Sequence, residues 1–379
     1  MRLLNVDSKE LHEIPDSTLT KTKYAILSHR WEERGEITFR DLGNLDDPQL
    51  RTSYEKIDGC CRQAKADGLA WVWIDTCCIN KDSSAELSEA INSMFRWYED
   101  AEVCYVYLSD VPSGEIPWLP DSSFRKSLWF TRGWTLQELL APRYKVFYDK
   151  NWSLIGAVHN SDYEIHCVEQ LEVGHHPQKS LQRNSWRYLP NPSMPTVDLT
   201  DAIHETTGID RQVITNNRKL YTVHAAEKMD WASCRKTTRP EDIAYCLLGI
   251  FGVNMPPLYG EGGRAFLRLQ KEIIHNTYDH SIFSWGLGGY QLDNRDCPHW
   301  DFLARHPDAF RGFSRTINTF RTGGALKSES DISVFQTKRH YSLTNLGLQI
   351  ELPLIPLNCA SKEAGEEGKK IQCHSLLDS

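Results

Sequence analysis

The sequence lacks the features that mark membrane, secreted and nucleic-acid-binding proteins. No stretch approaches the roughly 18 consecutive apolar residues of a membrane-spanning helix, and the first residues, MRLLNVDSKE, become polar too early for a secretory signal. No basic run exceeds a few residues and the net charge is −8, whereas nucleic-acid-binding proteins usually present a basic face. These absences predict a cytoplasmic protein with no membrane span and no nucleic acid among its partners.

The cysteines form no pattern that is typical of a metal site or a disulfide framework. There are 11 of them, an odd number, with vicinal pairs at 60–61 and 77–78 and no CxxC. Structural zinc needs spaced Cys or His ligands that converge, and disulfide-rich secreted domains are shorter and denser in cysteine. We therefore expect no metal, and reduced thiols that are mostly buried as small hydrophobes.

Aromatic side chains, in contrast, are abundant, with 12 Trp, 15 Tyr and 13 Phe. An aromatic-rich core explains them most simply, and stacking on a ligand is the alternative. Trp71 and Trp73 lie in a run that predicts a buried strand, so both are assigned to the core.

Strand and helix signals alternate over the first 150 residues. Apolar runs predict strands at 24–27, 71–74, 103–108 and 144–148, and apolar periodicity predicts helices at 54–66 and 82–99. This alternation predicts an α/β fold, a flavodoxin-like, mainly parallel sheet flanked by helices. Ligands of such sheets bind beyond the carboxyl ends of the strands. The SHRW run at 28–31 follows the first strand, and Asp75 follows the second.

Three regions are expected along the chain: the α/β domain at 1–155, a helical extension of the same unit at 156–285, and a β-rich C-terminal region at 286–379. Helices are predicted near 198–206, 210–217, 241–251 and 263–276, and strand-like pieces near 333–335 and 347–354. The strand pattern stops at the end of the chain as it would inside a larger, truncated unit. The Pro- and Gly-containing loop at 109–131 is long enough to predict a functional lid.

A glycine-rich GEGG run at 260–263 comes directly before one of the predicted helices. Such a loop can hold phosphate at a helix N-terminus. The Gly-Lys-Ser/Thr of a Walker loop does not follow, so a plain helix entry is the preferred interpretation and a phosphate cradle is the alternative.

Three blocks carry a resemblance to a known family. They are YAILSHRW at 24–31, VWIDTCCIN at 72–80 and RGWTLQELLAP at 132–142, with ELSEAINSMFRWY at 86–98 fitting between them. In this order and spacing they resemble the signature blocks of the fungal heterokaryon-incompatibility (HET) domain family, and the resemblance covers about residues 20–150. Two blocks at 239–251 and 257–262 resemble the region that often follows. Lys81 departs from the pattern, since the family usually has Gln there, and Arg30 lies at a variable position.

The resemblance implies a role in programmed cell death when unlike fungal individuals fuse, a form of fungal innate immunity. Members of the family are thought to be distantly TIR-like, which agrees with the predicted order of strands and helices. The likeness further implies self-association through the TIR-like domain and an incompatibility partner protein. Such domains often precede nucleotide-binding and repeat domains.

The same likeness points to one catalytic residue. Trp134, Glu138 and Leu139 resemble the Trp-Cys-x-x-Glu-Leu segment of plant TIR domains, whose glutamate is catalytic in NAD⁺ cleavage. NAD⁺ would then be a substrate and no cofactor is expected. One carboxylate is chemically sufficient, because nicotinamide leaves as a neutral molecule without a general acid. The carboxylate can stabilise the oxocarbenium-like ribose, hold its hydroxyls or orient water.

Other residues near the predicted strand ends are candidates for binding the substrate. Trp31 or Trp134 could stack on a ring, and Arg30 or Arg132 could meet the pyrophosphate. The remaining candidates are Ser28, His29 and Asp75. His29 is expected to be a hydrogen-bonded residue of the site, because adjacent residues such as Ser28 and His29 rarely point together as a nucleophile pair.

Alternatives remain open at this stage. Thr135 and Glu138 have the spacing of a capping box, so Glu138 could cap its own helix, and Asp75 could cap a helix or loop instead of contacting a ribose. The alternative to NAD⁺ hydrolysis is a non-enzymatic TIR-like module for death signalling and oligomerisation.

Overall fold

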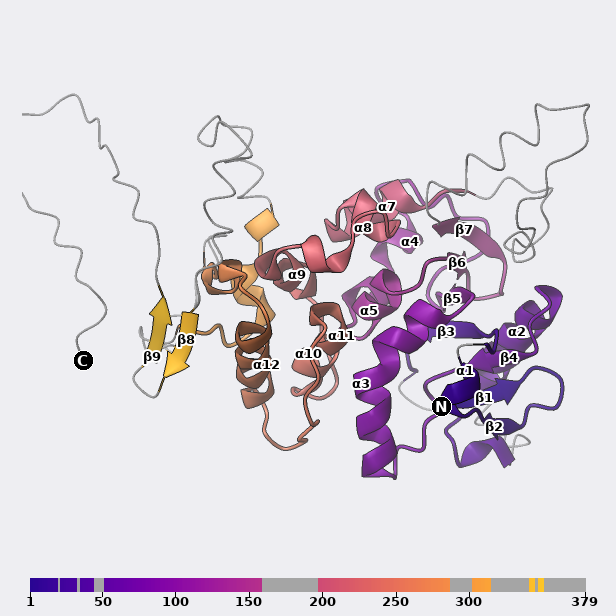
Figure 1. Ribbon diagram of the computed structural model, residues 1–379. Helices are drawn as coiled ribbons and strands as arrows, with labels where there is room; N and C mark the ends of the chain where they lie inside the picture. The colour runs from indigo at the N-terminus through magenta and orange to yellow at the C-terminus, as the bar shows by residue number, and fades with distance from the viewer. Residues whose placement is uncertain are drawn as a thin grey trace, which may run out of the picture. The chain divides into compact units, whose positions relative to one another are not determined.

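The structure is a computed structural model that describes residues 1–19, 21–32, 35–43, 51–158, 197–286 and 302–314, together with the backbone of two short strands at 341–344 and 347–350. The chain divides into two compact units, Met1–Gln336 and Thr337–Ser379. The first unit contains a seven-stranded sheet and the helices around it, and the second contains the two short strands (Figure 1).

The sheet of the first unit has the strand order β2-β1-β4-β3-β5-β6-β7. The pairs β4–β3, β3–β5 and β5–β6 are parallel, and the outer pairs are antiparallel. The strands are β1 (Arg2–Asn5), β2 (Leu11–Glu13), β3 (Ala25–His29), β4 (Trp71–Trp73), β5 (Val103–Tyr107), β6 (Lys145–Tyr148) and β7 (Leu154–Val158).

The expected α/β class is confirmed, but a mainly parallel sheet is correct only for its centre. The sheet as a whole is mixed, since β1, β2 and β7 add antiparallel strands at its two edges. These three strands were not predicted. β1 and β2 have four and three residues, and runs that short show no usable period of hydrophobicity.

The order of the central strands places a topological switch point in the sheet. Across the sheet the central strands lie in the order β4-β3-β5-β6. Numbered by their order along the chain, these four strands are 2-1-3-4, which is the order of flavodoxin-like sheets. α2 (Arg51–Ala66) connects β3 to β4, whereas α3 (Ser84–Asp100) connects β4 to β5 across β3. The connections therefore diverge between β3 and β5, and ligands of such sheets bind outside the carboxyl ends of these two strands.

Aromatic side chains fill the core as predicted. Trp73 is fully buried and packs against Trp97 and Tyr98 of α3, with ring centroids 5.5 Å and 5.9 Å apart. Trp71, also expected in the core, is only half-buried at the first position of β4, where it meets the ring of His12 edge-on at 5.1 Å. The expectation of buried thiols is confirmed for six described cysteines, namely Cys60, Cys61, Cys77, Cys78, Cys104 and Cys246, whereas Cys234 is exposed.

Within the described residues 197–286, six α-helices belong to the extension that follows the sheet. They are α7 (Thr200–Thr207), α8 (Arg211–Ile214), α9 (Ala225–Ala232), α10 (Asp242–Tyr245), α11 (Leu248–Phe251) and α12 (Arg264–Asn276). The single helix predicted at 241–251 is split into α10 and α11, and α9 was not predicted. In Figure 1, α10 and α11 lie between α3 and α12, in agreement with their contacts.

Two close contacts hold the extension against the α/β part. A Cβ atom on Gly249 of α11 would lie 2.0 Å from Cβ of Phe95 on α3, so only glycine allows this approach. The fully buried Lys145 of β6 donates hydrogen bonds to Pro142 O (2.8 Å), Ile214 O (2.9 Å) and Asn216 Oδ1 (3.1 Å). This amine therefore joins the sheet to the end of α8.

The long loop after β5 is an ordered structure with two short helices, α4 (Ser123–Lys126) and η3 (Leu128–Thr131). Asp110 fixes it, because its carboxylate accepts hydrogen bonds from Ser127 Oγ (2.7 Å) and Leu128 N (2.8 Å). The loop delivers Trp129 into the protein interior, where it is 1% exposed. Its role as a lid stays a prediction.

In the second unit, β8 (Tyr341–Thr344) and β9 (Gly347–Ile350) form an antiparallel pair. β9 falls in the strand predicted near 347–354, and the piece predicted at 333–335 lies outside the described residues, so a β-rich region remains a prediction. Within the part of the chain that is described, no helix has the length and apolarity needed to cross a membrane.

Candidate functional site

The central pair of the candidate site is Ser28, near the end of β3, and Glu138, on α5 (Thr135–Leu140). Ser28 Oγ donates a hydrogen bond of 2.5 Å to Glu138 Oε2, and Trp129 Nε1 donates one of 2.9 Å to Ser28 Oγ. Ser28 is 0% and Glu138 is 7% exposed. The predicted catalytic carboxylate thus lies inside the protein at the carboxyl end of β3, beside the diverging connections of the sheet.

The pKa of Glu138 is raised to about 8, chiefly because burial disfavours the charged carboxylate. Hydrogen bonds from Ser28 and Tyr98 lower the pKa, and the nearby charge of Asp75 raises it. At neutral pH the carboxyl group is therefore mostly protonated in this closed arrangement. A perturbed carboxyl group of this kind, at the strand ends of an α/β sheet, is typical of a functional site.

Glu138 does not cap its own helix. The first turn of α5 has no side-chain capping bond, and Thr135 Oγ1 instead donates to Trp129 O (2.6 Å) and Arg132 O (2.9 Å). The capping-box interpretation of these positions is wrong, because the Thr135 hydroxyl bonds to carbonyls that precede the helix and the Glu138 carboxyl group bonds to Ser28.

Asp75 lies directly beyond β4 and organises the second half of the site. Its Oδ2 accepts a hydrogen bond of 2.8 Å from Trp31 Nε1, and its Oδ1 is 3.8 Å from His29 Nε2. The Nζ atom of Lys81 stands 3.5 Å from the centroid of the Trp31 ring and stabilises it by a cation–π contact. Burial raises the pKa of Asp75, and the positive charge of Lys81 opposes this shift. Trp31 is 44% exposed, so it borders solvent.

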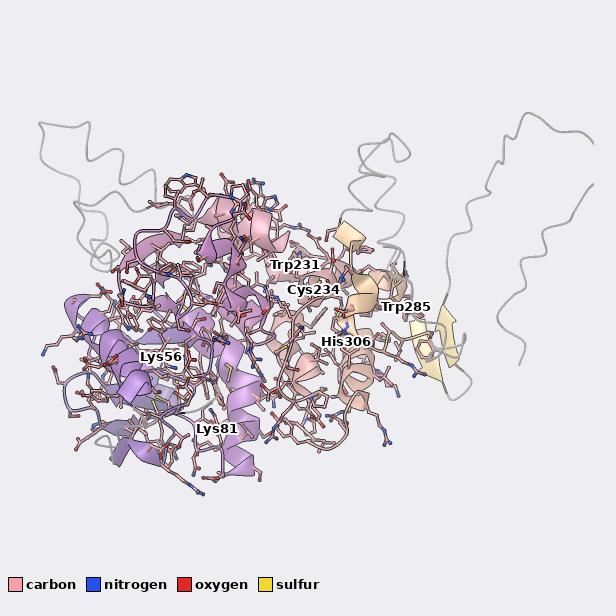
Figure 2. All side chains as sticks on the ribbon, turned by 180° about the vertical axis from the view of Figure 1, so that it is seen from behind. Lys56, Lys81, Trp231, Cys234, Trp285 and His306 are labelled. Atoms are coloured by element: carbon pink, nitrogen blue, oxygen red, sulfur yellow. The ribbon has the colours of Figure 1, made fainter. Side chains whose placement is uncertain are left out.

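His29 is the least satisfied residue of the site. Both of its ring nitrogens are buried without a hydrogen-bond partner among the residues that the structure describes, although a hydrogen-bonded imidazole was expected. Burial lowers its pKa well below the usual value, and the charges of Lys56 and Lys81 act in the same direction, so the ring is neutral (Figure 2 labels both lysines). Buried polar atoms without partners are costly, which makes His29 a natural contact for a bound molecule. In the same described part of the chain, the buried Nε of Arg30 also has no hydrogen-bond partner, although its Nη2 lies 4.0 Å from Glu32 Oε2.

Two of the predicted site residues make their polar contacts elsewhere. Arg132 Nη2 donates to Thr238 Oγ1 at 3.1 Å, and the Trp134 side chain hydrogen-bonds to Asp242. Both contacts join the start of α5 to the helical extension. The structure thus brings together the predicted residues Ser28, His29, Trp31, Asp75 and Glu138, whereas Arg132 and Trp134 face a different set of partners.

Several residues of the site were not predicted from the sequence. Trp129 comes from a loop without periodicity, and Tyr98 looked like an ordinary core position of α3. Arg235 is buried, at 5% exposed, and its charge acts on Glu138. It donates to Arg132 O (2.9 Å) and Thr135 Oγ1 (3.1 Å). No local spacing connects these positions to Glu138, because tertiary packing alone brings them together.

The glycine-rich run at 260–263 holds a carboxylate of the protein itself. Gly260 N and Gly262 N donate to Glu241 Oε1 at 2.8 Å and 2.9 Å, and these bonds lower the pKa of Glu241. The preferred interpretation, a helix entry, is confirmed by α12, while the anion position of the loop is already filled. Over the described ranges, no group of three or more His, Cys, Asp or Glu residues could hold a metal ion.

Comparisons with known proteins agree with the blocks at the strand ends. The family model of heterokaryon incompatibility proteins (HET) matches residues 24–117, and that of a domain of unknown function (DUF8212) matches residues 264–374. The chain belongs to the heterokaryon incompatibility family. It is 38% identical over 286 residues to vegetative incompatibility protein HET-E-1 of Podospora anserina. The match covers 72% of this chain but 18% of the relative's length. No solved structure matches.

Proposed function

We propose that this chain is an effector of heterokaryon incompatibility and programmed cell death that acts in the cytoplasm by cleaving NAD⁺ at the nicotinamide–ribose bond. The incompatibility role is supported by the family and by the name of the relative. The enzymatic part rests on one observation: Glu138 is buried at the carboxyl end of β3, where it is bonded to Ser28.

The proposed reaction requires Glu138 in its ionised form. Water adds to the ribose carbon, the bond to nicotinamide breaks, nicotinamide leaves neutral, and one proton is released. A carboxylate beside the ribose stabilises the positive charge that develops there. The raised pKa of Glu138 does not prevent this, because the cationic nicotinamide riboside of the substrate would favour the charged carboxylate and lower its pKa on binding.

The surrounding residues suggest how the substrate is held. His29 could offer to a ribose hydroxyl a ring nitrogen that has no hydrogen-bond partner among the described residues. Arg30 could offer its Nε, which likewise has no hydrogen-bond partner in the described ranges, to a phosphate. Trp31, exposed on one side and held by Asp75, provides a surface for stacking. Arg132 and Trp134 have no part in this proposal, because their partners are in the extension.

Because Ser28 and Glu138 are almost completely buried, the resting arrangement has to open before a dinucleotide reaches them. We propose that self-association of the TIR-like domain, or contact with an incompatibility partner, favours the open arrangement. Activity should therefore increase steeply with protein concentration or with enforced clustering.

The test is nicotinamide release from NAD⁺ by purified, concentrated protein, with and without fusion to an oligomerising tag. Glu138→Gln is expected to abolish release while the protein stays folded, and the exposed Lys126→Gln serves as the control. Release that persists in Glu138→Gln would refute the catalytic role of this residue.

The second candidate is a non-enzymatic TIR-like module that signals by oligomerisation. It is favoured by the same burial, since a protonated and enclosed Glu138 can be a purely structural residue. If clustered protein releases no nicotinamide, and expression of Glu138→Gln in a fungal host kills cells as the wild type does, this second function replaces the first.

A further inference from the structure

A concave site lies in the helical extension, and neither Ser28 nor Glu138 is part of its lining. It is an open pocket of about 610 Å³, formed by the segment after α9, by Gly263 before α12 and by residues 305–311. We call it the basic pocket, because its lining includes Arg235, Lys236, Arg305, His306 and Arg311. Cys234 and His306, both labelled in Figure 2, belong to the same lining.

The charge of the basic pocket contrasts with the rest of the chain, whose net charge is −8. Among the described residues of its lining, Asp308 is the one acidic residue, beside four Arg or Lys side chains. The carboxylate of Asp308 is already engaged, since Oδ1 accepts a hydrogen bond of 2.7 Å from Cys234 N and Oδ2 is 3.4 Å from His306 Nδ1. A concave surface lined by one sign of charge concentrates the electrostatic potential and attracts ions of the opposite sign.

The two cations at 235 and 236 make no ion pair with a carboxylate in the part of the chain that the structure describes. Arg235 donates to three neutral oxygens, Trp231 O (3.1 Å), Arg132 O and Thr135 Oγ1. Burial lowers the pKa of Arg235 to about 10, so it still carries its charge at neutral pH. Lys236 is exposed at the pocket. Glu138 is the acidic group whose charge acts on Arg235, and burial keeps its carboxyl group mostly protonated at neutral pH. An anion that enters the pocket would therefore meet the positive charges of Arg235 and Lys236.

The rest of the lining decides what kind of anion fits. Pro240, Ile243 and the side chain of Thr237 provide apolar surface beside the cations, and the volume lies within the range of roughly 300–1,000 Å³ that small-molecule pockets have. Arginine and lysine together favour phosphate oxygens, with arginine able to bind two of them at once.

We propose that the basic pocket is a binding site for a small molecule that carries a diphosphate and an apolar or planar group, such as a nucleoside diphosphate. The site lies outside residues 24–117 and joins the extension to the segment matched by the domain of unknown function. It does not depend on NAD⁺ cleavage, because Glu138 is not part of its lining.

Cys234 makes the proposal directly testable. Its thiol is exposed and belongs to the pocket lining, whereas the six other described cysteines are buried. The full chain is alkylated with iodoacetamide, and the modification rate of the peptide containing Cys234 is followed by mass spectrometry. We expect ADP and inorganic pyrophosphate to slow alkylation at least fivefold at saturation, and adenosine to have no effect at the same concentration.

A charge reversal in the pocket should weaken this protection. Lys236→Glu is expected to raise the ADP concentration needed for half-maximal protection at least tenfold. Lys150→Glu, which reverses the charge of another exposed lysine, should leave it unchanged, and Glu138→Gln should also leave it unchanged. Raising the salt concentration from 50 to 300 mM should weaken protection in the wild type, as expected for an electrostatic contact.

Two results would overturn the proposal. One is the absence of any protection of Cys234 by ADP or pyrophosphate in protein whose thermal unfolding is normal. The other is protection that adenosine provides equally well, or that Lys236→Glu and Lys150→Glu change to the same extent. Neither result would bear on nicotinamide release, so this proposal and the proposed function can fail independently.

Discussion

Ser28 Oγ donates a 2.5 Å hydrogen bond to Glu138 Oε2 and so connects the end of β3 to a helix 110 residues further along the chain. Trp129 completes the connection by donating to Ser28 from the loop between them. The carboxyl group is thereby enclosed by two of the HET-family blocks, 24–31 and 132–142, and by the loop that carries Trp129. Its protonation state is the property that both candidate functions depend on.

The burial of Glu138 should make the stability of the protein depend on pH. In the unfolded chain this carboxyl ionises near its ordinary pKa of 4.5, whereas in the folded chain it stays protonated up to about pH 8. The folded state is therefore favoured most at low pH and loses this advantage as the pH rises towards 8. Each pH unit in this window is worth about 1.4 kcal/mol.

Glu138→Gln should remove this dependence, because the amide does not ionise. Relative to the variant, wild-type protein should lose on the order of 4 kcal/mol of unfolding free energy between pH 5 and pH 8, measured by urea denaturation. Glu89→Gln, on the exposed surface of α3, is the control. Its unfolding free energy should differ from that of the wild type by the same amount at pH 5 and at pH 8. If the difference in unfolding free energy between wild type and Glu138→Gln were also the same at pH 5 and pH 8, the Glu138 carboxyl group would be ionised in the folded wild-type protein.

Ser28→Ala should alter the pH profile of nicotinamide release. Loss of the Ser28 hydroxyl removes a hydrogen bond that favours the charged carboxylate, so the pKa of Glu138 should rise further. One such bond is worth about 1–1.5 kcal/mol, so activity at pH 7 should fall about tenfold and recover partly above pH 8. A uniform loss at every pH would indicate that Ser28 only supports the local fold.

Lys145→Met should destabilise the contact between the sheet and the extension. The substitution leaves Pro142 O, Ile214 O and Asn216 Oδ1 without their donor inside the protein, which should cost about 2–4 kcal/mol of unfolding free energy. The comparable change at the exposed Lys150 should alter stability by less than about 0.5 kcal/mol. Equal effects of the two substitutions in urea denaturation would contradict the proposed anchoring role.

Gly249→Ala should show how tightly α11 packs on α3. The added methyl group would lie 2.0 Å from Cβ of Phe95, and the required shift of the helices should cost about 1–3 kcal/mol. Because the clash involves Cβ, Phe95→Ala should relieve only part of this cost, whereas Phe95→Gly should relieve most of it. A double-mutant cycle with Phe95→Gly measures this coupling, and additive effects would show that the two helices pack less closely.

The sequence predicted the central strands and the longer helices well, for a physical reason. α2, α3 and α12 have 16, 17 and 13 residues, long enough for the helical period of apolar residues to be recognised. The buried central strands were visible as continuous apolar runs. β1 and β2 were missed because four and three residues carry no period, and only their pairing with β4 and with each other defines them.

The sequence predicted those site residues that lie at the carboxyl ends of the central strands. Ser28, His29 and Asp75 were identified because parallel strands direct their carboxyl ends to one edge of the sheet. Trp134, in contrast, was proposed from the resemblance to plant TIR domains and as a ring for stacking, and Arg132 as a cation for the pyrophosphate. Their side chains bond to the extension instead. Neighbouring residues on a short helix point in different directions, so proximity along the chain did not predict their partners.

The sequence by itself determined the α/β class, the HET-family blocks and the placement of candidate residues at the strand ends, because these depend on local periodicity and on motifs within single segments. Only the tertiary structure decided that Glu138 is enclosed and protonated, that Glu241 fills the glycine-rich loop and that Arg235 and Lys236 line the basic pocket. Burial, pKa and pocket shape depend on contacts between segments far apart in the chain, and a linear pattern of residues does not specify those contacts.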